Sequence, residues 1–184
     1  MARTNPQILR SKRWIIHSLL ELMKEKKYSD ITITEIVKNA DLTRAAFYNN
    51  FKSKEEILAV HVHSLWEEHI YQKLESIEDI SPFDILLLGL AASEKNREFA
   101  LLLRKNKLEY LFQKEFDANH LKLIPYINKR VRAEDIDRDN FGHYASLLAT
   151  GYFNILFDWL EKEDAERETS EYMANLMVNL KIQD

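Results

Sequence analysis

The sequence has no cysteine, only 3 glycine and 3 proline residues, and no long apolar run. The absence of cysteine excludes disulfides and thiolate chemistry. No run approaches the roughly 18 apolar residues of a membrane span, and no apolar signal core follows the first residues, so we expect a cytoplasmic chain with no membrane partner. Because helix breakers are few and 46% of the 184 residues are hydrophobic, the composition predicts an all-α fold with a substantial core.

Charge is divided unevenly along the chain, whose formal net charge is -4. Residues 1–60 contain 11 Lys and Arg against 7 Asp and Glu, whereas residues 61–184 contain 15 against 23. Arg3, Arg10, Lys12 and Arg13 all precede the first acidic residue, Glu21. A basic first part on an acidic remainder suggests that the first part meets a polyanion.

The motifs of common enzyme and metal sites are missing from the sequence. It has no Gly-rich phosphate loop, no HExxH and no GxSxG pattern, so we expect neither an enzyme nor a cofactor. His61 and His63 are two residues apart, which places them on different faces of a helix. The other histidines are isolated, so we expect no metal site; a metal-responsive sensor would need these histidines to converge in the fold.

Two short helices between longer ones are the main feature of the first 60 residues. The first helix should run over 11–26, with Ile16, Leu19, Leu20 and Met23 at helical spacing on one face. Thr32-Ile-Thr-Glu35 has the capping-box pattern, Thr43 can cap a second short helix through about residue 49, and Ser53-Lys-Glu-Glu56 repeats the capping box at the start of a long helix. This spacing predicts a helix-turn-helix, braced by apolar residues at 33, 36, 37, 40, 42, 47 and 51.

Residues 32–58 read TITEIVKNADLTRAAFYNNFKSKEEIL. This stretch resembles the DNA-binding signature of the TetR/AcrR family of transcriptional regulators. The matching residues are Thr32, Ile36, Ala40, Leu42, Thr43, Phe47, Tyr48, Phe51 and the run Ser53 to Leu58. The resemblance implies an N-terminal helix-turn-helix DNA-binding domain, expected at residues 1–55, and a C-terminal regulatory and dimerisation domain, expected at 56–184.

Four positions depart from the family pattern. Lys27 and Asp41 stand where glycine is usual; a left-handed turn kept at Lys27 would cost on the order of 1 kcal/mol, whereas aspartate tolerates that conformation. Ala45 also replaces a common glycine and favours helix. Asn50 stands where His or Tyr is more usual, so a phosphate contact there would have a shorter reach.

By resemblance, the second short helix reads DNA. Arg44 can bind guanine, the methyl groups of Ala45 and Ala46 suit thymine, and Asn49 can pair with adenine. The other residues implied in DNA binding, mostly through phosphates, are Thr32, Thr34, Thr43, Tyr48, Asn50, Lys52 and Lys54. Alternatively, Thr43 is only a helix cap, Tyr48 is a core residue with a surface hydroxyl, and Lys52 and Lys54 belong to a solvated face.

The rest of the chain should form a second helical region. Ser81-Pro82 is a good helix start after a loop near 78–80. Helices are predicted near 83–92, 95–104, 107–116, around Pro125, and over 137–161 and 169–182. In the family the last two helices pair across a two-fold axis. Two DNA-binding domains (heads) are needed to bind the two half-sites of an operator. The residues predicted at a homodimer interface are Leu148, Tyr152, Ile155, Trp159, Met173, Leu176, Met177 and Leu180; the alternative is a monomeric core.

Aromatic side chains are concentrated in this second region, which has 15 of the 20. By resemblance they would line a pocket for a small-molecule effector, although an ordinary helical core has the same composition. The candidate pocket residues are Trp66, Phe99, Tyr110, Phe112, Phe116, Tyr126, Phe141 and Tyr144. A polar line at His143, Ser146, Thr150, Asn154 and Asp158 is either a solvent-facing edge or part of a cavity or dimer seam.

The sequence thus predicts a sequence-specific transcriptional regulator that binds double-stranded DNA as a homodimer. Repression released by a small-molecule effector is the commoner mode in the family. A TetR-like regulator whose C-terminal domain binds a protein partner as co-activator, or a metal-responsive sensor, are the alternatives.

Overall fold

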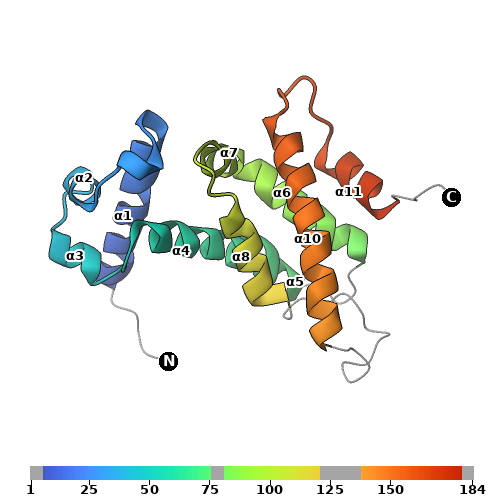
Figure 1. The fold of residues 1–184 in the computed structure, drawn as a ribbon, viewed down its shortest axis with the longest axis horizontal. Helices are drawn as coiled ribbons and strands as arrows, with labels where there is room; N and C mark the ends of the chain where they lie inside the picture. The colour runs from blue at the N-terminus through green and yellow to red at the C-terminus, as the bar shows by residue number, and fades with distance from the viewer. Residues whose placement is uncertain (1–5, 76–80, 121–137, 180–184) are drawn as a thin grey trace. The chain divides into compact units, whose positions relative to one another are not determined.

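The computed structural model describes residues 6–75, 81–120 and 138–179, and these residues form helices and no strand. The predicted all-α fold is therefore confirmed. The chain divides into two compact units, Met1–Val62 and His63–Asp184 (Figure 1). Within the described ranges, no helix has the length and apolar character needed to cross a membrane.

The first unit contains α1 (Pro6–Glu25), the 3-10 turn η1 (Tyr28–Asp30), α2 (Ile33–Asn39), α3 (Arg44–Tyr48) and most of α4 (Lys54–Trp66). α1 begins earlier than predicted, with Pro6 in its first turn, where proline is tolerated. Its buried face is centred on Ile15, Ser18 and Leu19, not on the predicted Ile16 and Leu20. Periodicity missed Ser18 because it is polar; its hydroxyl donates to the carbonyl of Ile36 over 2.7 Å, which makes its burial acceptable.

A π-helical turn interrupts the long helix that follows. α4 runs directly into η2 (Glu67–Tyr71) and then α5 (Gln72–Glu75). The π turn brings three consecutive residues, His69, Ile70 and Tyr71, into buried positions. A regular α-helix turns 100° per residue, so it would bury three consecutive residues only where it is covered on more than one side.

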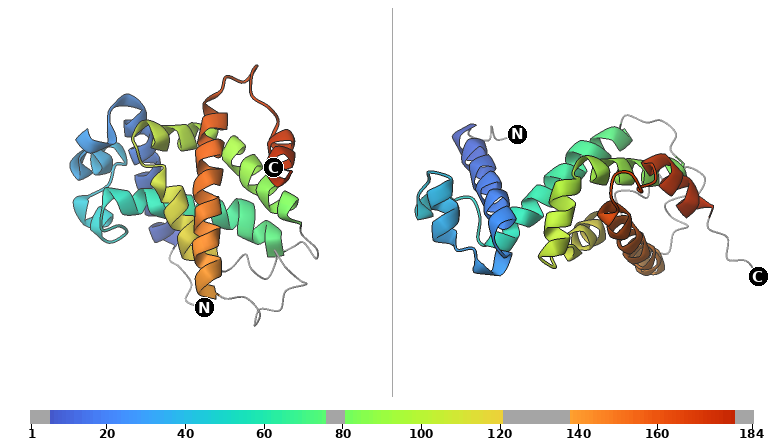
Figure 2. Two further views of the ribbon diagram at one scale, coloured as in Figure 1. Left: turned by 45° about the vertical axis from the view of Figure 1, so that its right-hand side comes forward. Right: turned by 90° about the horizontal axis from the view of Figure 1, so that it is seen from above.

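The second unit contains α6 (Pro82–Lys95), α7 (Arg97–Lys105), α8 (Tyr110–Asn119), α10 (Arg138–Glu161) and α11 (Ser170–Val178). α11 packs on α6, and α10 packs along α8 and α7 (Figures 1 and 2). Ser81 caps α6 as predicted, in a reciprocal capping box with Asp84. The predicted loop near 78–80 and the helix around Pro125 lie outside the described residues.

Aromatic rings fill the interior of the second unit. Trp66 lies 6.3 Å from Phe116 and 6.5 Å from Phe153, measured between ring centroids. Phe112 meets Phe157 edge-on at 5.6 Å.

The C-terminal end of α10 is fixed by Arg97. Its guanidinium donates hydrogen bonds to the carbonyls of Leu160 and Lys162, which satisfies carbonyl groups that the helix leaves unpaired.

Gly89 of α6 lies against the side chain of Tyr152 of α10. A Cβ atom added to Gly89 would lie 2.6 Å from the hydroxyl of Tyr152. Burial raises the pKa of this phenol. By contrast, Gly151 directly precedes Tyr152 and lies on another face of α10, and a Cβ added to it would meet nothing within 4 Å.

Candidate nucleic-acid interface

α2 is fixed at both ends by residues that the sequence singles out. The Glu35 backbone N–H donates to the Thr32 hydroxyl over 3.2 Å, and the Thr32 N–H donates to the Glu35 carboxylate over 2.9 Å, which is the predicted capping box. The ammonium of Lys26 and the two bonds from Thr32 lower the pKa of Glu35 to about 2. At the other end, Asp41 adopts φ 52°, and the N–H of Leu42 donates to the carbonyl of Val37 over 2.8 Å. The helix therefore ends in a Schellman turn, and the expectation that Asp41 tolerates the left-handed conformation is confirmed.

Lys27 does not adopt the left-handed turn. Its backbone is extended, with φ -63° and ψ 139°, just before η1. The cost anticipated for a non-glycine residue there does not arise, because the chain leaves α1 through a 3-10 turn instead.

α3 is a single short helix held from behind. The Thr43 hydroxyl accepts the N–H of Ala46 over 3.1 Å, so Thr43 is the helix cap. Phe47 is fully buried and packs 6.2 Å from Phe51 and edge-on to Tyr48 at 5.3 Å. The buried rings on one side of α3 leave its other side turned outward.

The outward side of α3 carries the residues predicted to read DNA. Thr43, Arg44, Ala45, Tyr48 and Asn49 are exposed, with Tyr48 at 53%. Ala46 is half-buried. Among the described residues, the Arg44 guanidinium makes no hydrogen bond or ion pair, so its five donors are available for a ligand. Thr32 and Thr34 of α2 and Lys52 after α3 are also exposed.

Asn50 points back into the first unit. Its side-chain amide donates to the carbonyl of Ala46 over 2.7 Å, and its Oδ1 is buried without a hydrogen-bond partner among the described residues. In this position Asn50 closes the end of α3 and does not extend outward.

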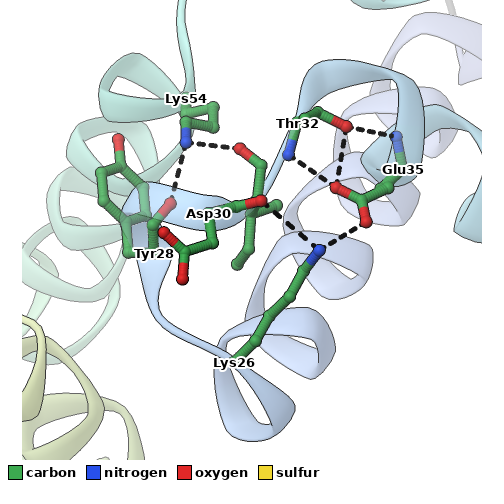
Figure 3. A network of polar contacts seen from close by, with 7 residues as sticks. Lys26, Tyr28, Asp30, Thr32, Glu35 and Lys54 are labelled. Atoms are coloured by element: carbon green, nitrogen blue, oxygen red, sulfur yellow. Dashed lines mark hydrogen bonds and ion pairs between the residues drawn. The ribbon is translucent and has the colours of Figure 1, made fainter.

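Lys54 is likewise turned inward, as Figure 3 shows. Its Nζ donates to the carbonyl of Tyr28 over 2.8 Å and to the carbonyl of Ile31, and it lies 4.5 Å from the centroid of the Tyr28 ring. Partial burial lowers the pKa of Lys54, while the carboxylates of Asp30 and Glu35 oppose that shift.

The predicted capping box of α4 is incomplete. Ser53 accepts the N–H of Glu56, but the Glu56 carboxylate accepts the N–H of Lys52 and not that of Ser53.

A second lysine, which directly follows α1, binds the same turn as Lys54. Lys26 forms an ion pair with Glu35 and donates to the carbonyl of Asp30 over 3.5 Å (Figure 3). Sequence reasoning missed this network, in which Lys26, Tyr28 and Lys54 take part. The Lys54 contacts join residues 26 and 23 positions apart, and no local pattern signals such a pairing.

The candidate pocket residues do not all lie together. Trp66, Phe99 and Phe112 are buried and Phe116 is half-buried, all within the aromatic interior, whereas Tyr110 is exposed. Tyr126 and the side chains of Phe141 and Tyr144 lie outside the described residues.

The predicted dimer residues divide into an inner and an outer set. Trp159 and Met173 are buried in the second unit, and the Trp159 indole donates to the carbonyl of Glu168 over 2.8 Å. Tyr152 and Met177 are half-buried. Leu148, Ile155 and Leu176 are exposed, and Leu180 lies outside the described residues.

The polar line along α10 borders its contact with α8 and α7. The Ser146 hydroxyl donates to Asp117 over 3.0 Å, and that of Thr150 lies 3.4 Å from Gln113. Asp158 pairs with Arg104 over 2.7 Å. Asn154 is exposed. These residues therefore form an edge between helices, and the side chain of His143 lies outside the described residues.

Histidines do not gather into a metal-binding group in the described part of the chain. No cluster of three or more His, Cys, Asp or Glu residues suited to a metal ion occurs there. His63 instead binds Glu115 of α8 over 2.8 Å, and burial lowers the pKa of His61.

A short, capped helix with an exposed polar face, braced by a second short helix, defines a helix-turn-helix protein of the DNA-binding class. Residues 15–60 match the model of a family described as bacterial regulatory proteins, tetR family. Residues 15–60 are therefore a DNA-binding domain of the tetR type. No curated protein sequence matches it.

Solved structures with a similar fold extend the comparison to nearly the whole chain. A TetR transcriptional regulator from Streptococcus agalactiae 2603V is 21% identical with a TM-score of 0.63, and the match covers 94% of this chain and 93% of that one. The dihydroxyacetone kinase operon activator DhaS is 20% identical with a TM-score of 0.56, and the match covers 92% of both chains. At these identities the similarity establishes the fold of the second unit.

Proposed function

We propose that the chain binds a specific operator as a homodimer and represses transcription until a small-molecule effector releases it. The observation that carries this proposal is the outward face of α3, where Arg44, Ala45, Tyr48 and Asn49 are exposed while Phe47 anchors the helix from behind. A helix held in this way presents side chains of a size and chemistry suited to the major groove.

Within that face we assign base contacts to Arg44, Ala45, Ala46 and Asn49, with Thr34 beside them. Arg44 would bind guanine O6 and N7 in a bidentate manner, a contact that gives about 1–3 kcal/mol of discrimination. Thr32, Thr43, Tyr48 and Lys52 would bind phosphates, which set the register and not the sequence.

A second copy of the chain supplies the second head. Support comes from exposed apolar side chains on the last two helices: Leu147 at 70%, Leu148 at 55% and Ile155 on α10, and Tyr172, Leu176 and Val178 on α11. Exposed apolar side chains gathered on two helices are typical of an interface, and an operator with two half-sites needs two heads. Sedimentation should give a dimer, and a Leu148→Glu variant should give a monomer with weaker operator binding.

The small molecule would act by shifting the equilibrium between two arrangements of the DNA-binding domains in the dimer. It can shift that equilibrium by no more than the difference between its affinities for the two arrangements.

A second candidate function is activation through a protein partner. It is favoured by the fold shared with DhaS, which is described as an operon activator. Co-purification from the source cells separates the two: a stoichiometric protein supports activation, and a bound small molecule supports release.

Selection of bound genomic fragments tests the DNA-binding proposal most directly. Once an operator is known, Arg44→Ala should lose roughly 5- to 150-fold in affinity for it and little for random duplex. The matched control Tyr48→Phe removes one hydroxyl and should weaken both duplexes equally. Equal losses of Arg44→Ala on both duplexes would contradict the assignment of Arg44 to a base.

A further inference from the structure

Lys54 opens α4 at the position where the family resemblance implies a phosphate contact. Its ammonium group has three N–H donors. In the structure two acceptors are the backbone carbonyls of Tyr28, at 2.8 Å, and Ile31. The face of the Tyr28 ring, 4.5 Å away, adds a cation–π contact. Lys54 is thus enclosed by three acceptors from one short stretch of chain (Figure 3).

That stretch determines where α2 begins. η1 leads directly to Ile31, which is 1% exposed, and to Thr32, the N-cap of α2. Lys26, the residue after α1, holds the same stretch through Glu35 and the Asp30 carbonyl. The start of α2 is therefore fixed from both sides, by Lys26 just after α1 and by Lys54 at the start of α4.

A phosphate contact would conflict with this arrangement. To reach solvent, Lys54 would give up both carbonyls and the Tyr28 ring, and the turn before α2 would lose these contacts with the start of α4. Lys52, two residues earlier, is exposed, and among the described residues its side chain has no partner. A lysine for the phosphate is therefore available without breaking any contact.

We propose that Lys54 is a positioning residue, which locks the turn before α2 to the start of α4 and so holds the helix-turn-helix in its DNA-reading geometry. It binds no phosphate itself; Lys52 does. The DNA-binding test of this inference rests on the proposed function. The contacts of Lys54 with the turn before α2 do not depend on that function.

The salt dependence of DNA binding separates a positioning lysine from a phosphate ligand. The probe is a labelled 30-base-pair random-sequence duplex, titrated by fluorescence anisotropy over a series of KCl concentrations. Each phosphate that the protein no longer neutralises lowers the slope of log K against log salt by about 0.9. Lys54→Met should weaken binding roughly tenfold with an unchanged slope. The matched control Lys52→Met should lower the slope. A lowered slope for Lys54→Met overturns the proposal.

A measurement on the wild-type chain tests the proposal even if a lysine variant does not fold. Lysines are acetylated to a low extent with and without the duplex, and the sites are quantified by mass spectrometry. DNA should protect Lys52 and leave the acetylation of Lys54 unchanged; protection of Lys54 equal to that of Lys52 overturns the proposal.

Failure of the proposed function would be recognised separately. If the wild-type chain shows no salt-dependent binding to duplex DNA, DNA binding itself is wrong. Thermal unfolding then still tests the lock, because Lys54→Met should lower the melting temperature clearly more than Lys52→Met. Equal melting temperatures for the two variants overturn the lock.

Discussion

Replacing Gly89 by alanine would put a methyl group where α6 and α10 leave no room for one. The added carbon would lie 2.6 Å from the Tyr152 hydroxyl and 3.5 Å from the ring carbon that bears it, whereas ordinary contacts are 3.4–4 Å. Tyr152 would have to shift, and its ring already packs edge-on against Phe153 at 5.2 Å. Such overpacking costs about 1–3 kcal/mol.

Gly151 provides a matched control on α10. Its added Cβ would meet nothing within 4 Å, so Gly151→Ala should show only the gain of a helical alanine over glycine, about 0.5–1 kcal/mol. Gly89→Ala has the same gain and the packing penalty. We therefore expect it to be less stable than Gly151→Ala by about 1–3 kcal/mol.

Urea unfolding followed by tryptophan fluorescence measures this difference. Both variants should be compared at two protein concentrations, because Gly151 lies near the exposed apolar residues of α10 and a dimer contact there would make its effect depend on concentration. Tyr152→Phe removes the clashing oxygen, so in that background Gly89→Ala should lose most of its penalty. If Gly89→Ala is as stable as Gly151→Ala, the close contact between Gly89 and the Tyr152 hydroxyl is wrong.

Three further predictions concern charge and backbone. The pKa of Glu35 is about 2 in the folded chain against an ordinary 4.5, so its contribution is present above pH 4.5 and lost as the pH falls toward 2; Glu35→Gln should flatten the melting temperature over that range. Lys107 has φ 58° at the end of α7, so Lys107→Gly should raise the free energy of unfolding by about 1 kcal/mol in urea titrations. Arg10 and Arg13 are exposed on α1; if they bind phosphates, changing both to Gln should lower the salt slope by about 0.9 for each phosphate released, and an unchanged slope would show that they do not.

Local patterns predicted the elements of the first unit well. The caps at Thr32 and Thr43 and the left-handed turn at Asp41 involve residues at most five apart, so their chemistry is visible in a short window of sequence. The buried face of α1 was predicted less accurately, because Ser18 is buried through a hydrogen bond to Ile36, which lies 18 residues away in the sequence.

The direction of individual polar side chains could not be predicted in this way. Asn50 and Lys54 have the residue types of phosphate ligands, yet both are bound to backbone carbonyls of the first unit. In the second unit, the spacing of Trp159 and Met173 suits a dimer seam and a core equally, and the fold buries both. Periodicity identifies an apolar face but not the element that covers it.

The π turn at Glu67–Tyr71 has a consequence for sequence comparison. A turn closed by i to i+5 bonds holds one residue more than an α-helical turn, and so acts as a single-residue insertion. A relative with a regular α-helix at this place would align with this chain only after a one-residue gap inside 67–71. An ungapped alignment would pair every later residue of the helix with a neighbour rotated by about 100°, and equivalent core positions would look unrelated.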